Sequence, residues 1–204
     1  MKIGIISGSH RKNSQSLKVA RAAERHLLDQ QLCQQTYVYD LGENPLPLWD
    51  ESIWAGDPEW QQRLEPIGRE LTSCDGFIVV SPEWHGMAPA GLKNFFLMWG
   101  NGELAHKPAL LVSVSASVGG TYPIAELRMS SYKNNRICYL PEHLIVRNVS
   151  KVLNPAAADN DSESHETISA RLDYCLRLLG SYTEAFQQIR SSGNVSLETY
   201  NFGM

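Results

Sequence analysis

Hydrophobic residues in this chain alternate between two patterns, one typical of buried strands and one typical of amphipathic helices. Short apolar runs rich in β-branched residues predict strands buried on both faces of a parallel sheet, and they lie near residues 2–7, 36–40, 76–81, 109–115 and 144–149. Between them, apolar residues at steps of three and four predict helices, near residues 17–28, 60–71, 89–99, 123–132 and 168–186. This alternation predicts a doubly wound α/β fold, with a five-stranded parallel sheet and helices on both faces.

The length of the chain favours one domain. With 204 residues, of which 43% are hydrophobic, it can bury one substantial core but has little room for a second. We therefore expect a single domain over residues 1–190 and a polar tail over residues 191–204. No apolar run approaches the ~18 residues of a membrane span, and the first strand pattern begins without a cleavable signal segment. These features predict a cytoplasmic protein with no membrane span.

Charge and cysteine usage exclude some classes of function. The formal net charge is -4, and no basic stripe is present, so nucleic-acid binding is disfavoured. The cysteines are widely separated and form no C-x-x-C pair, and no histidine stands at metal-ligand spacing. We expect no metal site and reduced core thiols at Cys33, Cys74, Cys138 and Cys175.

The loop after the first strand, GSHRKNSQS at residues 8–16, combines small, hydroxylic and basic residues. It joins a buried strand to a helix N-terminus, where unpaired N–H groups and the macrodipole favour an anion. The candidate phosphate ligands are Ser9, Arg11, Ser14, Gln15 and Ser16, and Arg11 is the foremost because a guanidinium binds phosphate in a bidentate manner. A simpler interpretation, in which the serines and Asn13 only cap the helix, stays open. The loop has neither a P-loop nor a G-x-G-x-x-G motif, so a mononucleotide phosphate remains as the ligand.

Two further loops follow predicted strands, PEWHGMAP at residues 82–89 and the glycine-containing stretch at residues 117–120. Ligands of open α/β sheets bind outside the carboxyl ends of the strands, so one ligand could touch all three loops. The segment at residues 41–58 is a long, apolar connection. It packs against its own domain, or it forms the wall of a ligand cleft or a subunit contact.

Three motifs together resemble the NADPH-dependent FMN reductase family of flavodoxin-like proteins, over about residues 1–120. They are GSHRKNSQS at residues 8–16, LPLWDE at residues 46–51 and SPEWHGMAPAGLKNFF at residues 81–96. The resemblance implies a flavodoxin-like fold that binds FMN, with the phosphate in the first loop. It places the isoalloxazine ring at Pro82, Glu83, Trp84, His85 and Gly86, and the third loop approaches the flavin through Ser117, Gly119 and Gly120. The chain departs from the residues that are common in the family at four positions. The family commonly has asparagine where this chain has His85, a small hydroxylic residue in place of Met87, glycine in place of Ala90 and aspartate in place of Leu97.

The resemblance also implies a function, an FMN-dependent NAD(P)H oxidoreductase. Such an enzyme passes two electrons by hydride transfer to a small-molecule acceptor such as a quinone or free flavin, with NADPH or NADH as co-substrate. The flavin supplies the redox chemistry, so no catalytic side chain is expected. His85 could donate a proton or merely bond a backbone carbonyl, and we interpret Glu83 as structural because a carboxylate near the ring disfavours a reduced anion.

Two further expectations complete the sequence-based picture. We expect backbone N–H groups of the second and third loops to bond the pyrimidine edge of the flavin, and aromatic surface residues to drive assembly into a homodimer or homotetramer. The alternative function is an FMN-binding electron carrier or regulatory flavoprotein without NAD(P)H turnover.

Overall fold

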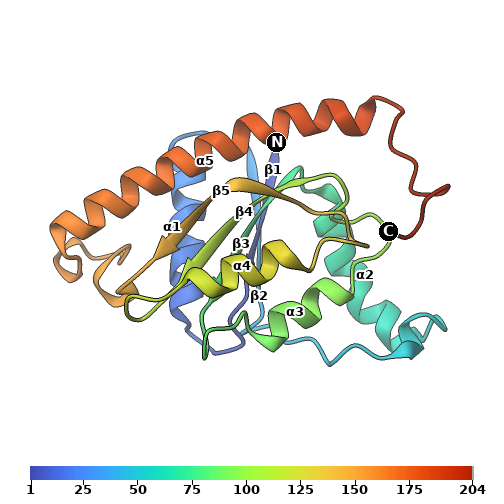
Figure 1. The fold of residues 1–204 in the computed structure, drawn as a ribbon, viewed down its shortest axis with the longest axis horizontal. Coiled ribbons are helices and arrows are strands. Elements are labelled where there is room, and N and C mark those ends of the chain that lie inside the picture. Colours follow the sequence, from blue (N-terminus) through green and yellow to red (C-terminus); the bar gives the residue numbers. More distant parts are fainter. Residues whose placement is uncertain (204) are drawn as a thin grey trace.

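The protein folds around one parallel sheet, which confirms the predicted fold class. The structure, a computed structural model, describes residues 1–203. The strands lie in the order β2-β1-β3-β4-β5 (Figure 1), which is the flavodoxin-like doubly wound order. Their bounds are β1 Lys2–Ser7, β2 Gln35–Asp40, β3 Gly76–Pro82, β4 Pro108–Val114 and β5 Cys138–Val146.

Helices cover both faces of the sheet. Helices α1 (Gln15–Asp29) and α5 (Ser162–Ser191) pack on one face, and α2 (Pro58–Ser73), α3 (Ala90–Leu97) and α4 (Thr121–Met129) pack on the other (Figure 1). Three short 3-10 turns lie in the connections, at Glu51–Ile53, Val149–Lys151 and Ala157–Asp159. This arrangement is why the central strands are uniformly apolar, since no face of β3 or β4 meets water.

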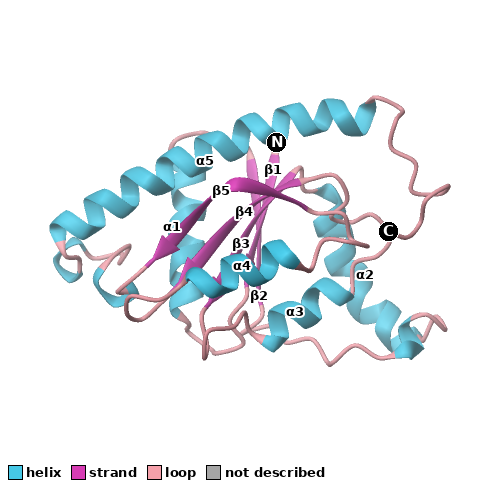
Figure 2. Ribbon diagram, in the orientation of Figure 1, coloured by secondary structure: helices cyan, strands magenta, loops and turns pink. Residues whose placement is uncertain are grey.

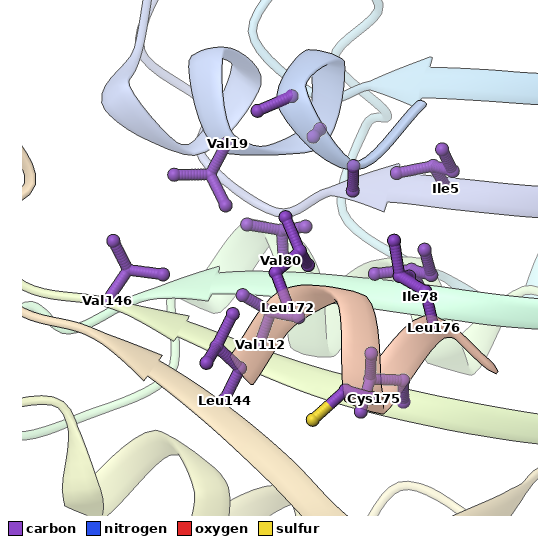
Figure 3. Packing of buried hydrophobic residues seen from close by; sticks show 14 of the residues in the cluster. Ile5, Val19, Ile78, Val80, Val112, Leu144, Val146, Leu172, Cys175 and Leu176 are labelled. Atoms are coloured by element: carbon purple, nitrogen blue, oxygen red, sulfur yellow. The ribbon is translucent and has the colours of Figure 1, made fainter. Parts of the chain in front are cut away.

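The face under α1 and α5 is an aliphatic core. Figure 3 shows Val19 of α1 and Leu172 and Leu176 of α5 beside Val80 and Val112 of the sheet. All five side chains are at most 2% exposed, so each contributes about 1.5–3 kcal/mol to folding by leaving water. The core therefore fixes α1, whose N-terminus follows the first loop.

The opposite face is an aromatic core. Phe95 of α3 lies 5.6 Å from Tyr39 and 5.5 Å from Trp99 between ring centroids, the latter in an edge-to-face arrangement. Such contacts add to the large area that aromatic rings bury. They hold α3 against the sheet, and α3 follows directly on the second loop.

The fifth strand and the fourth helix differ from their predicted bounds. The sequence predicts the fifth strand at residues 144–149, whereas β5 begins six residues earlier, at Cys138, and ends three residues earlier, at Val146. Its pairing with β4 has a register irregularity opposite Ala109 and Leu111. The irregularity accommodates Pro141 in an edge strand, where a missing N–H is tolerated. Helix α4 starts two residues earlier than predicted, because Gly120 in the left-handed conformation serves as its N-cap, and it ends three residues earlier, at Met129.

The apolar segment at residues 41–57 packs against its own domain. The Asn94 side chain of α3 donates from Nδ2 to the Pro47 carbonyl (2.7 Å) and accepts at Oδ1 from the Trp49 N–H (2.8 Å). Asn94 is only 5% exposed, so these bonds are shielded from water. Trp49 also packs edge-to-face on Trp54, with centroids 4.7 Å apart, but Trp54 remains 79% exposed.

The chain after α5 has no regular secondary structure up to Gly203 (Figure 2). It returns to the body of the protein, where the Arg136 guanidinium donates to the carbonyls of Tyr200 and Asn201. The last residue of the predicted tail, Met204, lies outside the described residues. In residues 1–203, no helix is both long and apolar enough to cross a bilayer.

Candidate functional site

Three loops meet at the carboxyl ends of β1, β3 and β4. The first loop is joined to β3 directly, because the Gly8 N–H donates to the Val80 carbonyl at 2.8 Å. On the other side, the Leu41 N–H bonds the Ser7 carbonyl at 3.1 Å. The strand order reverses between β1 and β3, and the crevice at such a switch point is where doubly wound sheets bind ligands.

Two serines of the first loop have structural roles. The Ser14 hydroxyl caps α1 by accepting from the Leu17 N–H at 3.0 Å, and Ser9 Oγ accepts from the Arg11 N–H at 3.3 Å. The left-handed conformation of Asn13, with φ of 50°, turns the chain into the helix. The capping interpretation therefore holds for Ser14, whereas Ser9 stabilises a turn within the loop; each hydroxyl keeps a hydrogen that it can donate.

The remaining donors of the first loop are unpaired. Ser16 Oγ is buried, with 1% of the residue exposed, and has no hydrogen-bond partner. The N–H groups of Gln15 and Ser16 lie in the first turn of α1, where a helix offers no internal acceptor, and no other acceptor reaches them within residues 1–203. The exposed Arg11 side chain likewise pairs with no group in the described structure. A buried polar atom without a partner is costly, so this arrangement fits a bound anion.

The second loop is a two-residue β-hairpin. Trp84 and Met87 exchange both backbone hydrogen bonds, at 3.1 and 2.9 Å, and the two residues between them have positive φ, 50° for His85 and 73° for Gly86. These are the features of a type I′ turn. The N–H groups of His85 and Gly86 bond no acceptor among the residues described and remain available to a ligand.

This turn explains why a histidine stands at position 85, since asparagine and histidine are enriched among non-glycine residues with positive φ. We expect His85→Asn to keep the unfolding free energy within about 0.5 kcal/mol, whereas His85→Val should lower it by about 1–2 kcal/mol, because a β-branched residue is strained there. Urea denaturation of both variants measures this. Equal stability of the two variants would contradict the assigned turn.

The third loop is attached to the second by a carboxylate. Glu83 Oε2 accepts from the Gly120 N–H at 2.6 Å, while its own N–H donates to the Val114 carbonyl at 3.0 Å. Glu83 thus faces the third loop, in agreement with its interpretation as structural. Gly120 uses its N–H in this bond, so among the N–H groups of the third loop this one is not offered to a ligand.

The predicted residues do not all line one surface. Arg11, Glu83, Trp84 and His85 line an open cavity of about 490 Å³. Pro82 is buried in β3 and Ser117 is exposed, and neither of them lines this cavity. A larger cavity, of about 800 Å³, lies between α2 and residues 98–103, and none of its lining residues belongs to the three loops.

Sequence reasoning missed two residues of the site. His10 packs edge-to-face on Trp84, with centroids 4.5 Å apart, and so joins the first loop to the second. Arg147, just after β5, donates from Nε to the Gly119 carbonyl at 3.0 Å. His10 stands inside a recognised motif and could have been considered, but nothing in the sequence indicates the contact of Arg147.

Comparison with known proteins decides the family. The sequence model of the family described as NADPH-dependent FMN reductase matches residues 1–151. The chain belongs to this family. The match covers β1 to β5 and all three loops, which confirms the resemblance found in the motifs, and ends before α5.

The chain is also similar to individual curated proteins over part of its length. An NADPH azoreductase from Bacillus sp. (strain OY1-2) is 28% identical over 120 residues, or 59% of this chain. A quinone reductase from a Pseudomonas putida strain is 32% identical over 124 residues, or 58% of this chain. The matched segments span 62% of the length of each relative, less than two thirds.

The fold of the whole chain extends the likeness beyond these segments. A flavoenzyme NAD(P)H:(acceptor) oxidoreductase from Paracoccus denitrificans superposes with a TM-score of 0.70 at 19% identity, covering 91% of this chain and 98% of that one. At this identity the comparison supports the fold alone.

Proposed function

We propose that this protein is an FMN-dependent NAD(P)H oxidoreductase that passes two electrons by hydride transfer to a quinone, free flavin or related small-molecule acceptor. The family match supports the proposal, and the observation that carries it is the set of unpaired donors in the first loop beside an open cavity. The names of the two relatives, a quinone reductase and an azoreductase, support the acceptor class. Bound FMN would supply the hydride chemistry.

The residues of the first loop fit the phosphate of FMN. The Ser16 hydroxyl and the N–H groups of Gln15 and Ser16 provide three neutral donors at a helix N-terminus, and Arg11 provides a charged fork. Ser9 and Ser14 stand next to them, each with a hydroxyl hydrogen to donate. Together these groups would solvate a phosphate dianion with hydrogen bonds and offset part of its charge.

The second loop fits the ring of FMN. The N–H groups of His85 and Gly86 are free at the tip of the hairpin and would bond the carbonyl oxygens of the pyrimidine edge, where negative charge grows on reduction. Trp84 would exclude water from one side of the cavity. The positive φ of the turn explains why a histidine is tolerated at position 85.

Substitution of Arg11 tests the proposal. Hydrogen bonds to charged groups are worth about 1.5–3 kcal/mol, so we expect Arg11→Ala to raise the Kd for FMN at least tenfold, as measured by quenching of flavin fluorescence. Lys12→Ala is the matched control, because it removes one positive charge from the same loop, and it should change the Kd less than threefold. Equal effects in both variants, or wild-type protein that binds no FMN, would refute the proposal.

The alternative is an FMN-binding carrier or regulator that does not turn over NAD(P)H. Steady-state oxidation of NADPH or NADH in the presence of a soluble quinone distinguishes the two. Continuous oxidation of NADPH or NADH that depends on FMN supports the oxidoreductase. If neither nucleotide bleaches the flavin absorbance or is turned over, the result supports the carrier.

We also propose that the protein assembles into a homodimer or homotetramer. Large apolar side chains gather around α3 and α4 with high exposed fractions, 79% for Trp54, 63% for Leu97 and 79% for Met129. Exposed apolar surface of this kind is typical of subunit contacts. A monomer in light scattering at micromolar concentration would overturn this assignment.

We also propose a cytoplasmic location. All four cysteines carry free thiols, which is typical of reducing compartments, and NAD(P)H is the proposed electron donor. Fractionation of the source cells, with the protein absent from the soluble cytoplasmic fraction, would contradict this location.

A further inference from the structure

One peptide group in the third loop is held from both of its ends. The N–H of Gly120 donates to Glu83 Oε2 at 2.6 Å, and the carbonyl of Gly119 accepts from Arg147 Nε at 3.0 Å. These two groups belong to the same peptide bond, so an acidic and a basic side chain together determine which way its dipole points. Charge-assisted bonds of this kind are about twice as strong as neutral ones.

Both residues of this peptide must be glycine for the contact to form. A Cβ on Gly119 would lie 2.6 Å from Glu83 Oε1, and a Cβ on Gly120 would lie 2.5 Å from Ile145 Cγ2. Gly120 also has a φ of 105°, which side chains disfavour. Two adjacent glycines have no intrinsic preference for one peptide orientation, so the orientation depends on the side chains that bind it.

Glu83 is well placed to transmit this constraint between loops. Its backbone belongs to the second loop and is bonded to the end of β4 through the Val114 carbonyl, while its carboxylate binds the third loop. Arg147 extends the connection to the end of β5, but it is exposed and so its bond is the weaker of the two.

We propose that Glu83 is a positioning residue that fixes the orientation of the Gly119–Gly120 peptide and thereby holds the third loop in one conformation relative to the ring-binding hairpin. The consequence for FMN rests on the proposed function. The Gly120 N–H stays bonded to the carboxylate. Because Glu83 also lines the open cavity, its negative charge would disfavour a reduced anion of a flavin bound there.

Amide hydrogen exchange of the ¹⁵N-labelled protein without FMN tests the structural part. We expect Glu83→Ala to lower the protection of the Gly120 amide at least tenfold. Glu83→Gln, whose amide oxygen can still accept, should keep it within about threefold of wild type, and Arg147→Ala should lower it by less than Glu83→Ala. Unchanged protection in Glu83→Ala would overturn the proposal. If Glu83→Ala does not fold, loss of Gly120 protection in Glu83→Gln would overturn it, since Gln preserves the acceptor.

The FMN-loaded protein tests the consequence for the flavin. Glu83→Gln should bind FMN with a Kd within threefold of wild type, because the amide oxygen can still accept from the Gly120 N–H. It should shift the midpoint potential of the bound flavin to a more positive value, because the negative charge of the carboxylate is removed. Glu83→Ala should weaken binding. An unchanged potential in Glu83→Gln would contradict the electrostatic role. If the wild type binds no FMN while Gly120 protection still depends on Glu83, the proposed function fails and the positioning role stands.

Discussion

Gly8→Ala should destabilise the protein by about 2–3 kcal/mol and weaken FMN binding more than tenfold. A Cβ at this position would lie 2.8 Å from the Val80 carbonyl oxygen and 2.7 Å from Leu92 Cδ2. The leucine can move, but the carbonyl is part of β3, so the first loop itself must shift. Overpacking of this kind typically costs about 1–3 kcal/mol, and the shift would also weaken the Gly8–Val80 hydrogen bond.

Gly180→Ala is the matched control for this substitution. A Cβ on Gly180 would meet no atom within 4 Å, and the residue lies within α5, where alanine is favoured by about 1 kcal/mol over glycine. Urea denaturation should therefore show opposite changes in the two variants, and flavin titration should show a change in Gly8→Ala alone. If both variants gained stability, the close contact at Gly8 would be refuted.

Lys107→Met should lower the unfolding free energy by about 3 kcal/mol or more. The Lys107 ammonium is buried, with 5% of the residue exposed, and donates to three backbone carbonyls: Leu71 at 2.9 Å, Thr72 at 2.8 Å and Glu103 at 2.7 Å. Methionine fills a similar volume but donates nothing, so these carbonyls lose their partner at about 1–3 kcal/mol for each that stays buried. The exposed Lys151→Met is the control and should change stability by less than 0.5 kcal/mol.

The same lysine gives the stability a pH dependence. Burial lowers the pKa of Lys107 from 10.5 to about 8, so between pH 8 and pH 10 the unfolded chain binds this proton more tightly than the folded chain does. Stability of the wild type relative to Lys107→Met should therefore rise across this interval. Denaturation of both proteins at pH 7.5 and pH 9.5 measures the difference. A constant difference would show that Lys107 keeps its ordinary pKa in the folded state.

The strands and helices could be predicted because burial dominates their sequences. β3 reads GFIVVSP and is buried along its whole length, a pattern that few other structures produce. β5 could not be delimited in the same way, since it is an edge strand that contains Pro141 and an irregular register. In β5, the low strand propensity of the local sequence disagrees with its pairing to β4, and the pairing determines the structure.

The position of the candidate site could be predicted from the sequence, but the roles of its individual residues could not. The serines of the first loop look equivalent in the sequence, yet Ser14 caps the helix, and Ser16 alone keeps an unpartnered buried hydroxyl. Which serine caps depends on where the helix begins, and α1 begins at Gln15 rather than at Leu17. The contact between Arg147 and Gly119 joins residues 28 positions apart, and no local pattern indicates it.

The first loop is tied down on both sides, and this has a kinetic consequence. Gly8 is bonded to β3, and Lys18, just inside α1, donates from Nζ to the Val152 carbonyl and to Asn154 Oδ1 at 2.9 and 2.7 Å. A phosphate ester arriving from solution meets donors that are already in place, so little conformational entropy is lost on association. Capture should then proceed in a single phase whose rate depends on encounter and on removal of water from the anion, without a slower step of loop ordering.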